Sequence, residues 1–227
     1  MKYLAVDIGN VIFDVKFKEF AFKMSESFGG TPEEAFKKLN NFQKHQDLGL
    51  SSLIEDLKEQ FDIREPIYED VIINNWNNII LLNIPMAEML EDLYQNHDID
   101  IAILSNLGVD HFKIVDKELS KYKFYTNGAK HFSYQVGARK PTKIFYQSFL
   151  SQYPEYKYCP YIDDLQENLD MGKQFGFNPI YFNLSKFSES ERKIAILDLK
   201  LQILNASDIY ANVVYSNKLT LKDLSHD

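Results

Sequence analysis

The sequence predicts an α/β fold: a parallel sheet with helices on both faces and a helical cap inserted after the first strand. Short apolar runs bounded by turn residues, such as Tyr3 to Val6, are typical of strands buried on both faces of a parallel sheet. Residues 16–82 show only helical spacing, and beyond residue 83 short apolar runs alternate with helical segments. We therefore expect an α/β core made of residues 1–15 and 83–227 and a cap made of residues 16–82.

The predicted cap consists of four consecutive helices with no strand between them. Apolar residues recur at three- and four-residue steps from Phe17 to Phe28, which indicates the first helix. Thr31 to Glu34 combines a hydroxyl N-cap, a proline in the first turn and a glutamate that can reach back, so a second helix begins there. Ser52 repeats this device for a third helix, and a fourth is expected from about Pro66.

The remaining predicted strands come later in the chain and alternate with helices. They are Ile99–Leu104, a weaker strand at Lys123–Thr126, Tyr158–Ile162 and Ile180–Phe182. Proline has no backbone N–H to donate to a sheet ladder, so the strand predicted at Tyr158–Ile162 is favoured to begin at Pro160. Helices are expected from Pro85 and around residues 109–120, 141–151, 166–175 and 194–204. Residues 213–215 are interpreted as an edge strand before a frayed tail.

Composition excludes several classes of function. Acidic residues outnumber basic ones, 33 against 25, and no dense basic cluster offsets the net charge of −8, so we do not expect a nucleic acid partner. No apolar stretch approaches the ~18 residues of a membrane helix, and the first apolar run is too short for a signal peptide. Cys159 is the only cysteine, and its apolar segment indicates strand packing and a reducing, cytoplasmic location.

Four polar segments stand where ligands bind in open α/β sheets, beyond the carboxyl ends of strands. They are Asp7 with Gly9, Ser105-Asn106, Lys140 just before a predicted helix, and Asp163-Asp164 with Asn168. Each segment alone has a simpler interpretation, because carboxylates support turns, hydroxyls and amides cap helices, and lysines are solvated. Together they form a chemically coherent set at one end of the sheet, which favours a catalytic site.

These segments, in this order, resemble the motifs of the haloacid dehalogenase-like (HAD) hydrolase superfamily. The matching motifs are Asp7-Ile8-Gly9-Asn10-Val11, Leu104-Ser105-Asn106, Gly137 to Pro141, and Ile162-Asp163-Asp164 with Asn168. The helical insert also matches, and the resemblance covers about residues 1–184. It implies a Rossmann-like core, and the pattern looks most like the branch of bacterial sugar-1-phosphate phosphatases, such as glucose-1-phosphatases.

The resemblance implies a nucleophile and a metal site. Asp7 would attack phosphorus and form an aspartyl-phosphate that water then hydrolyses. Mg²⁺ would be the cofactor, bound by Asp7, the Gly9 carbonyl and Asp164, with Asp163 supporting them or acting as an alternative ligand. Three carboxylates that share a site are costly without a cation, which makes this role physically reasonable.

The same resemblance implies a phosphate-binding site. Ser105, Asn106 and neighbouring backbone amides would hold phosphoryl oxygens, and Lys140 would neutralise charge on both Asp7 and the phosphate. The partner would be a small-molecule phosphate ester, with a sugar phosphate as the favoured class. The chain would act as a monomer or a homodimer.

The chain departs from the family pattern at the position of the general acid and base. Most phosphatases of this superfamily carry a second Asp two residues after the nucleophile, where this sequence has Gly9. Loss of a general acid and base typically costs about 10²–10⁴ in rate. Either the substrate has a good leaving group, such as an anomeric or acyl phosphate, or a residue of the cap or Asp14, which is otherwise a loop cap, supplies the proton.

Two other functions stay open. A dehalogenase-type hydrolase would use Asp7 on carbon without a metal, although the pair Asp163-Asp164 argues that a metal binds. A weakly active or non-catalytic phosphate-binding protein would have kept the fold and lost turnover. Four residues are candidates for lining the cleft under the cap, with core packing or exposure as the alternative: Phe17, Phe20, His45 and Trp76.

Overall fold

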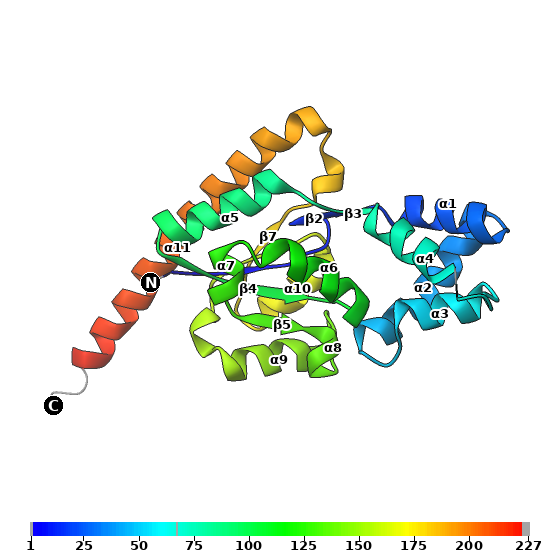
Figure 1. The fold of residues 1–227 in the computed structure, drawn as a ribbon. Helices are drawn as coiled ribbons and strands as arrows, with labels where there is room; N and C mark the ends of the chain where they lie inside the picture. Colours follow the sequence, from blue (N-terminus) through cyan, green and yellow to red (C-terminus); the bar gives the residue numbers. More distant parts are fainter. Residues whose placement is uncertain (1, 67, 224–227) are drawn as a thin grey trace.

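The computed structural model describes residues 2–66 and 68–223, and it contains one parallel sheet of five strands in the order β5-β4-β1-β6-β7 (Figure 1). The strands are β1 (Lys2–Val6), β4 (Ile99–Ser105), β5 (Lys130–Phe132), β6 (Pro160–Asp163) and β7 (Asn178–Tyr181). β1 pairs in parallel with β4 on one side and β6 on the other, so three consecutive strands of the sheet end side by side. The predicted parallel α/β fold is confirmed.

Alternate residues of the central strands point to opposite faces of the sheet. Leu4 and Val6 pack, with helices α5 (Ile84–Asn96), α6 (Val109–Leu119) and α11 (Glu189–Asp223), into one apolar cluster. Ala5 belongs to a second cluster, with α9 (Lys143–Gln152) and α10 (Gln166–Gln174) on the other face. The small Ala5 side chain leaves room there for aromatic residues of α9, so the two layers of helices hold the sheet between them. Short elements complete the core: α7 (Lys123–Asn127), α8 (Ser133–Val136) and the 3₁₀ turns Pro154–Tyr156 and Leu184–Lys186.

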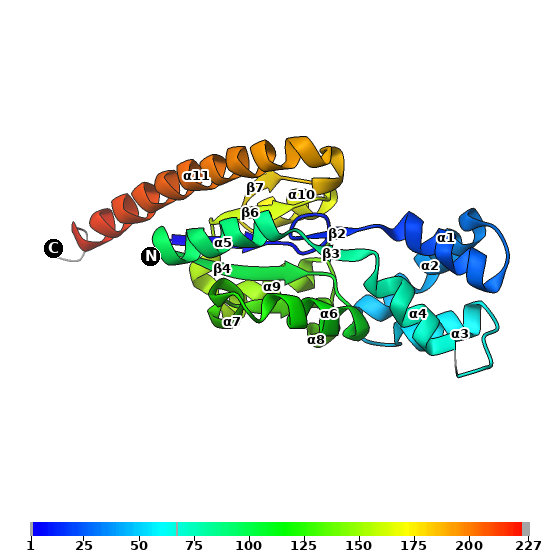
Figure 2. The same cartoon turned by 45° about the horizontal axis from the view of Figure 1, so that its top comes forward.

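Four helices form a separate layer beyond the carboxyl ends of the strands (Figure 2). They are α1 (Phe17–Phe28), α2 (Pro32–Asp47), α3 (Leu53–Gln60) and α4 (Tyr68–Asn77). In α2 the predicted capping box is present, because Thr31 Oγ1 accepts from Glu34 N at 3.2 Å and the Glu34 carboxylate accepts from Thr31 N at 2.9 Å. Ser52 caps α3 with one of these two bonds: its hydroxyl accepts a hydrogen bond from Glu55 N at 3.1 Å.

A two-stranded antiparallel ribbon, β2 (Phe13–Val15) with β3 (Ile80–Leu82), joins these helices to the sheet. The sequence analysis did not predict either strand, because three-residue strands carry no readable periodicity. We propose this ribbon as the boundary between core and cap, since the chain crosses between the two layers there in both directions.

Two strand predictions are wrong. Lys123–Thr126 lies in helix α7, and the strand of this unit, β5, begins at Lys130. Gly128 lies between α7 and β5. A side chain at this position would collide with the Ile101 carbonyl of β4, so the backbone lies directly against the sheet there before β5 begins. Residues 213–215 belong to α11, which runs to Asp223, because a short apolar run fits a helix as well as a strand.

Most other boundaries agree closely with expectation, but the helix expected at residues 194–204 is much longer and runs from Glu189 to Asp223. β6 begins at Pro160, as expected from the missing N–H of proline. The helix expected from residue 141, α9, begins at Lys143, two residues after the expected position. The end of the tail, residues 224–227, lies outside the described residues. In the part of the chain that the structure describes, no helix combines the length and the apolar character that crossing a membrane would require.

Candidate active site

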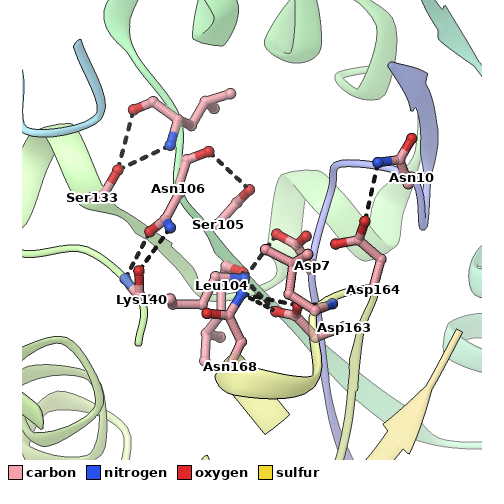
Figure 3. A network of polar contacts seen from close by, with 12 residues as sticks. Asp7, Asn10, Leu104, Ser105, Asn106, Ser133, Lys140, Asp163, Asp164 and Asn168 are labelled. Carbon is pink, nitrogen blue, oxygen red and sulfur yellow. Dashed lines mark hydrogen bonds and ion pairs between the residues drawn. The ribbon is translucent and has the colours of Figure 1, made fainter. Parts of the chain in front are cut away.

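The predicted site residues come together because the three central strands end beside one another (Figure 3). Asp7 follows β1, Ser105 ends β4, and Asp163 ends β6. These residues are 6%, 2% and 0% exposed, so their polar groups lie inside the protein and must find partners there. The structure thus brings the predicted segments to one rim of the sheet.

The Lys140 ammonium is the centre of this arrangement. Its Nζ lies 2.9 Å from Asp7 Oδ1 and 2.6 Å from Asp163 Oδ2, and it donates to the Leu104 carbonyl at 2.8 Å. The side chain is 1% exposed. Burial alone would lower the pKa of Lys140, but the charges of Asp163 and Asp7 outweigh it and hold the pKa above its ordinary value. Lys140 is therefore a fixed positive charge between two carboxylates.

Asn106 holds the backbone of Lys140 in position. Its Oδ1 accepts from Lys140 N at 2.7 Å, and its Nδ2 donates to the Lys140 carbonyl at 3.0 Å. Both ends of the amide are thereby engaged, so the structure gives Asn106 a positioning role that the sequence analysis did not identify. Ser105, its neighbour, donates to the Asn106 carbonyl at 3.5 Å, and its hydroxyl near the Asp7 carboxylate opposes part of the rise that burial gives to the pKa of Asp7. Ser133 Oγ accepts from Leu107 N at 2.9 Å and fixes the loop that follows.

The adjacent carboxylates of Asp163 and Asp164 have different environments. Asp163 accepts hydrogen bonds at both oxygens, from Lys140, from Asn168 Nδ2 at 2.9 Å and 3.2 Å, and from Leu165 N at 2.9 Å. Asp164 accepts at Oδ2, from Asn10 at 3.0 Å and from Asn183 at 3.3 Å. Asp163 is thus fully engaged by the protein, whereas Asp164 keeps an oxygen for a ligand.

Two of these partners were missed by the sequence analysis in different ways. Asn10 lies inside the first motif, but nothing in the sequence shows that it reaches across to Asp164. Asn183 follows β7, another parallel strand, so the rule that linked the other site residues could have found it.

The charges at this rim fit a divalent cation. Asp7, Asp163 and Asp164 each offer a carboxylate oxygen, these oxygens lie within 4.8 Å of one another, and Lys140 is the cation that contacts Asp7 and Asp163. Burial raises the pKa of Asp7, against the opposing charge of Lys140. Burial, followed by the charge of Asp7, raises the pKa of Asp164 to about 7. Closely spaced oxygen ligands with excess negative charge are what Mg²⁺ prefers, and a cation would remove the cost of ionising them.

A cavity of about 260 Å³ opens above these residues, between the sheet and the cap. Of the four cap candidates, Phe17 and Trp76 line it, Phe20 is fully buried, and His45 is exposed. The structure adds cavity residues that the sequence did not indicate, among them Gln43, Asp47, His111 and Arg139. A larger apolar hollow of about 640 Å³ lies beside α4 and α6 and contains none of the clustered carboxylates.

Two ion pairs connect distant parts of the chain near this cavity. Arg139 donates to Asp47 Oδ2 at 2.9 Å and 3.3 Å and so joins the loop before Lys140 to the end of α2. Asp14 forms a two-pronged pair with Arg192 of α11, at 2.7 Å for both bonds. Asp14 is thus a strand residue with a dedicated partner, not a loop cap, and it does not line the cavity.

Solved structures share this fold. A HAD family enzyme from Bacteroides thetaiotaomicron, in complex with magnesium and inorganic phosphate, is 18% identical over 84% of this chain and 98% of its own, with a TM-score of 0.69. A predicted HAD-like family hydrolase from Porphyromonas gingivalis is 15% identical over 87% and 97%, with a TM-score of 0.65. An L-2-haloacid dehalogenase from Xanthobacter autotrophicus, with chloropropionic acid covalently bound, is 14% identical over 84% and 80%, with a TM-score of 0.56.

No family model and no curated protein match the sequence. The structural likeness nevertheless confirms, for the fold, the resemblance that the motifs indicated: the chain has the fold of HAD-like hydrolases. Because both phosphate-binding and dehalogenase structures share it, the fold alone does not select the reaction.

Proposed function

We propose that this chain, with its HAD-like fold, is a Mg²⁺-dependent phosphatase that hydrolyses a small phosphomonoester through an aspartyl-phosphate on Asp7. The observation that carries the proposal is the position of the Lys140 ammonium, 2.9 Å from Asp7 and 2.6 Å from Asp163, beside a third carboxylate at one cavity. Sugar phosphates, as in the sugar-1-phosphate phosphatase branch, are the substrate class to test first.

The proposed reaction uses each residue for a distinct task. Asp7 forms a bond to phosphorus while the ester oxygen leaves, and water later releases phosphate from Asp7. Lys140 counters the charge that collects on the phosphoryl oxygens, and Ser105, whose hydroxyl lies near the Asp7 carboxylate, would donate to the same oxygens. The neighbouring Asn106 keeps Lys140 in place.

Three ligands would hold Mg²⁺: the Asp7 and Asp164 carboxylates and the Gly9 carbonyl. Asp164 suits this task better than Asp163, because the oxygens of Asp163 are already occupied by protein donors. When bound, Mg²⁺ would screen the repulsion between a carboxylate nucleophile and a phosphate dianion. Asp163 would then hold Lys140, Asn168 and the following loop.

The partner in this proposal is a small-molecule phosphate ester, because a cavity of about 260 Å³ admits a phosphoryl group with a small leaving group but not a macromolecule. The single cysteine is free and buried, which supports the proposed cytoplasmic location without requiring it.

A panel of phosphate esters with Mg²⁺ tests the proposal. We expect turnover of at least one ester, loss of that turnover with EDTA, and loss with Asp7→Asn. Absence of turnover for every ester, or turnover that survives Asp7→Asn, would reject it.

The likeness to a haloacid dehalogenase supports a second candidate, displacement at carbon by Asp7 without a metal. The clustered carboxylates count against it, because they would repel a carboxylate substrate. Release of halide from a 2-haloacid, insensitive to EDTA, would favour this candidate over the phosphatase. Binding of phosphate without any hydrolysis would favour a non-catalytic protein instead.

A further inference from the structure

The cavity contains one carboxylate that the cap supplies. Asp47 is the last residue of α2, and with Gln43, one turn earlier, it brings the end of that helix to the cavity that Asp7 and Lys140 also line. The Asp47 side chain is 3% exposed. Among the acidic residues described as lining this cavity, Asp47 is the only one outside the carboxylate cluster.

The core side of the cavity offers no carboxylate for proton transfer at the position where such a group would be expected. Gly9 has no side chain, and Asp14 is held by Arg192 away from the cavity. Asp7 and Asp164 are committed to the nucleophile and to the proposed metal. A carboxylate that donates a proton to the leaving group would therefore have to come from the cap, where the leaving group would lie.

The surroundings of Asp47 favour its protonated form. Burial raises its pKa, and although Arg139 opposes this effect, the pKa stays above the ordinary value. The negative end of the α2 dipole and the charge of Asp7 act in the same direction as burial. Both hydrogen bonds from Arg139 end on Oδ2, so Oδ1 remains for a ligand.

We propose that Asp47 is the general acid and base of the reaction and acts from the cap in place of the carboxylate that Gly9 lacks. This inference rests on the proposed phosphatase function and assigns a catalytic role within it. Arg139 is the positioning residue that holds Asp47 at the cavity.

The proton balance of the two steps is simple. In the first, the bond from Asp7 to phosphorus forms, the bond from phosphorus to the ester oxygen breaks, and Asp47 gives its proton to that oxygen. In the second, water attacks the aspartyl-phosphate, its proton passes to Asp47, and the bond to Asp7 breaks. Ester and water become alcohol and phosphate, and Asp47 is protonated again.

The dependence on the leaving group tests this role. We compare 4-nitrophenyl phosphate, whose leaving group needs no proton, with the primary alkyl ester that the wild type turns over fastest. In Asp47→Asn, the rate of the first step with the alkyl ester should fall by about 10²–10⁴. With the aryl ester the first step should persist within about tenfold and give a burst of one 4-nitrophenol per active site, because the second step has lost its base.

A second cap–core contact provides the matched control. Asp110 of α6 accepts from Leu53 N of α3 at 2.8 Å and does not line the Asp7 cavity. Asp110→Asn should change the rate of the first step by the same factor for both esters, and it should give no burst of 4-nitrophenol. If Asp47→Asn also slows the first step equally for both esters, Asp47 only holds the cap in place and the proposal is overturned.

A rescue experiment makes the test independent of any damage to the cap. A Cβ added at Gly9 would find only Asp7 Oδ2 within 4 Å, at 4.0 Å, so the backbone there leaves room for a side chain to begin. In the Asp47→Asn background, Gly9→Asp should raise the first-step rate with the alkyl ester at least tenfold. Failure of this rescue would count against Asp47 as the proton donor.

The outcomes also separate this inference from the proposed function. A wild type that hydrolyses only the aryl ester would remain a phosphatase but would overturn Asp47 as general acid. A wild type that hydrolyses no ester would overturn both. Asn at position 47 still offers an oxygen to Arg139, so we expect the variant to fold, which thermal unfolding can check.

Discussion

The two sides of the cavity are built differently. On the sheet side the charged groups around Lys140 are engaged: Lys140 contacts two carboxylates and a carbonyl, and Asp163 accepts at both oxygens, although the buried Asn168 Oδ1 there has no hydrogen-bond partner. On the cap side of the cavity, where α6 of the core meets α4 of the cap, the ring of His111 stacks on Trp76 with centroids 3.9 Å apart. The buried His111 Nε2 and Trp76 Nε1 have no hydrogen-bond partner.

This difference separates the parts of the site that hold the phosphoryl group from those that face the leaving group. The sheet side is organised before any ligand arrives, as electrostatic catalysis requires. The cap side keeps unpaired donors and acceptors, which is costly in the free protein and leaves capacity for a substrate.

Removal of the charge on the sheet side should have the largest effect on stability. Lys140→Met leaves Asp7 and Asp163 buried without a counter-charge, so the free energy of unfolding should fall by about 3–5 kcal/mol. Arg139→Met removes the partner of the cap residue Asp47 and is the matched control. It should cost less, about 1–3 kcal/mol, because Arg139 is partly exposed and Asp47 can take up a proton. Urea unfolding measures both, and equal losses would show that the two sides are not different.

Metal binding should stabilise the sheet side. Mg²⁺ at 100 times its dissociation constant should raise the free energy of unfolding by about 2.7 kcal/mol, and EDTA should reverse this. Asp164→Asn removes a proposed ligand and should abolish most of the increment. Asp198→Asn, at an exposed position of α11, is the control and should leave it unchanged. An increment that Asp164→Asn leaves intact would contradict the proposed ligand set.

The unpaired imidazole should make the cap side sensitive to acid. Burial lowers the pKa of His111 from 6.5 to about 4, so between these values the unfolded chain binds more protons and stability falls as the pH decreases. The full shift would be worth about 3 kcal/mol, and because the ring is partly exposed we expect about 1–2 kcal/mol.

His111→Phe keeps the stack on Trp76 and should flatten this part of the pH dependence of the free energy of unfolding. Carboxyl groups that titrate in the same pH range contribute equally to the free energy of unfolding of the variant and of the wild type. Their contribution therefore cancels when one curve is subtracted from the other. His45→Gln, at an exposed position of α2, should reproduce the wild-type curve. A His111→Phe curve parallel to that of the wild type would show that the imidazole is not responsible.

The same contrast explains what the sequence could predict. The sequence could predict that three site residues meet, because each lies at the end of a buried strand: Asp7, Ser105 and Asp163. Parallel strands bring their carboxyl ends to one rim of the sheet, and this does not depend on how the side chains pack. The sequence could not decide whether Asp163 or Asp164 faces the metal, since that depends on donors such as Asn183 from another strand. Asp47 was invisible for a related reason: its partner Arg139 lies 92 positions away.

The wrong strand predictions have a local cause. Lys123–Thr126 and residues 213–215 are both short apolar runs, for which a helix and a strand have the same pattern. The first is decided by contact with the rest of the fold, because Phe124 N donates to Glu91 Oε2 of α5 at 2.9 Å. Such tertiary contacts are not encoded in a window of four residues.

The smallest expected effect concerns the helix that carries Asp47. Thr31→Ala removes the N-cap of α2 and should lower the free energy of unfolding by about 1 kcal/mol. Turnover should stay within about twofold, because α2 spans 16 residues and the lost hydrogen bond lies about 24 Å from Asp47. Ser52→Ala, which removes the corresponding cap of α3, serves as the control and should behave alike. Thr31→Ala could instead lower the turnover of alkyl esters but not of 4-nitrophenyl phosphate. That result would show that the position of Asp47 depends on helical order along the whole of α2. The two sides of the cavity would then be coupled more tightly than their separate contacts indicate.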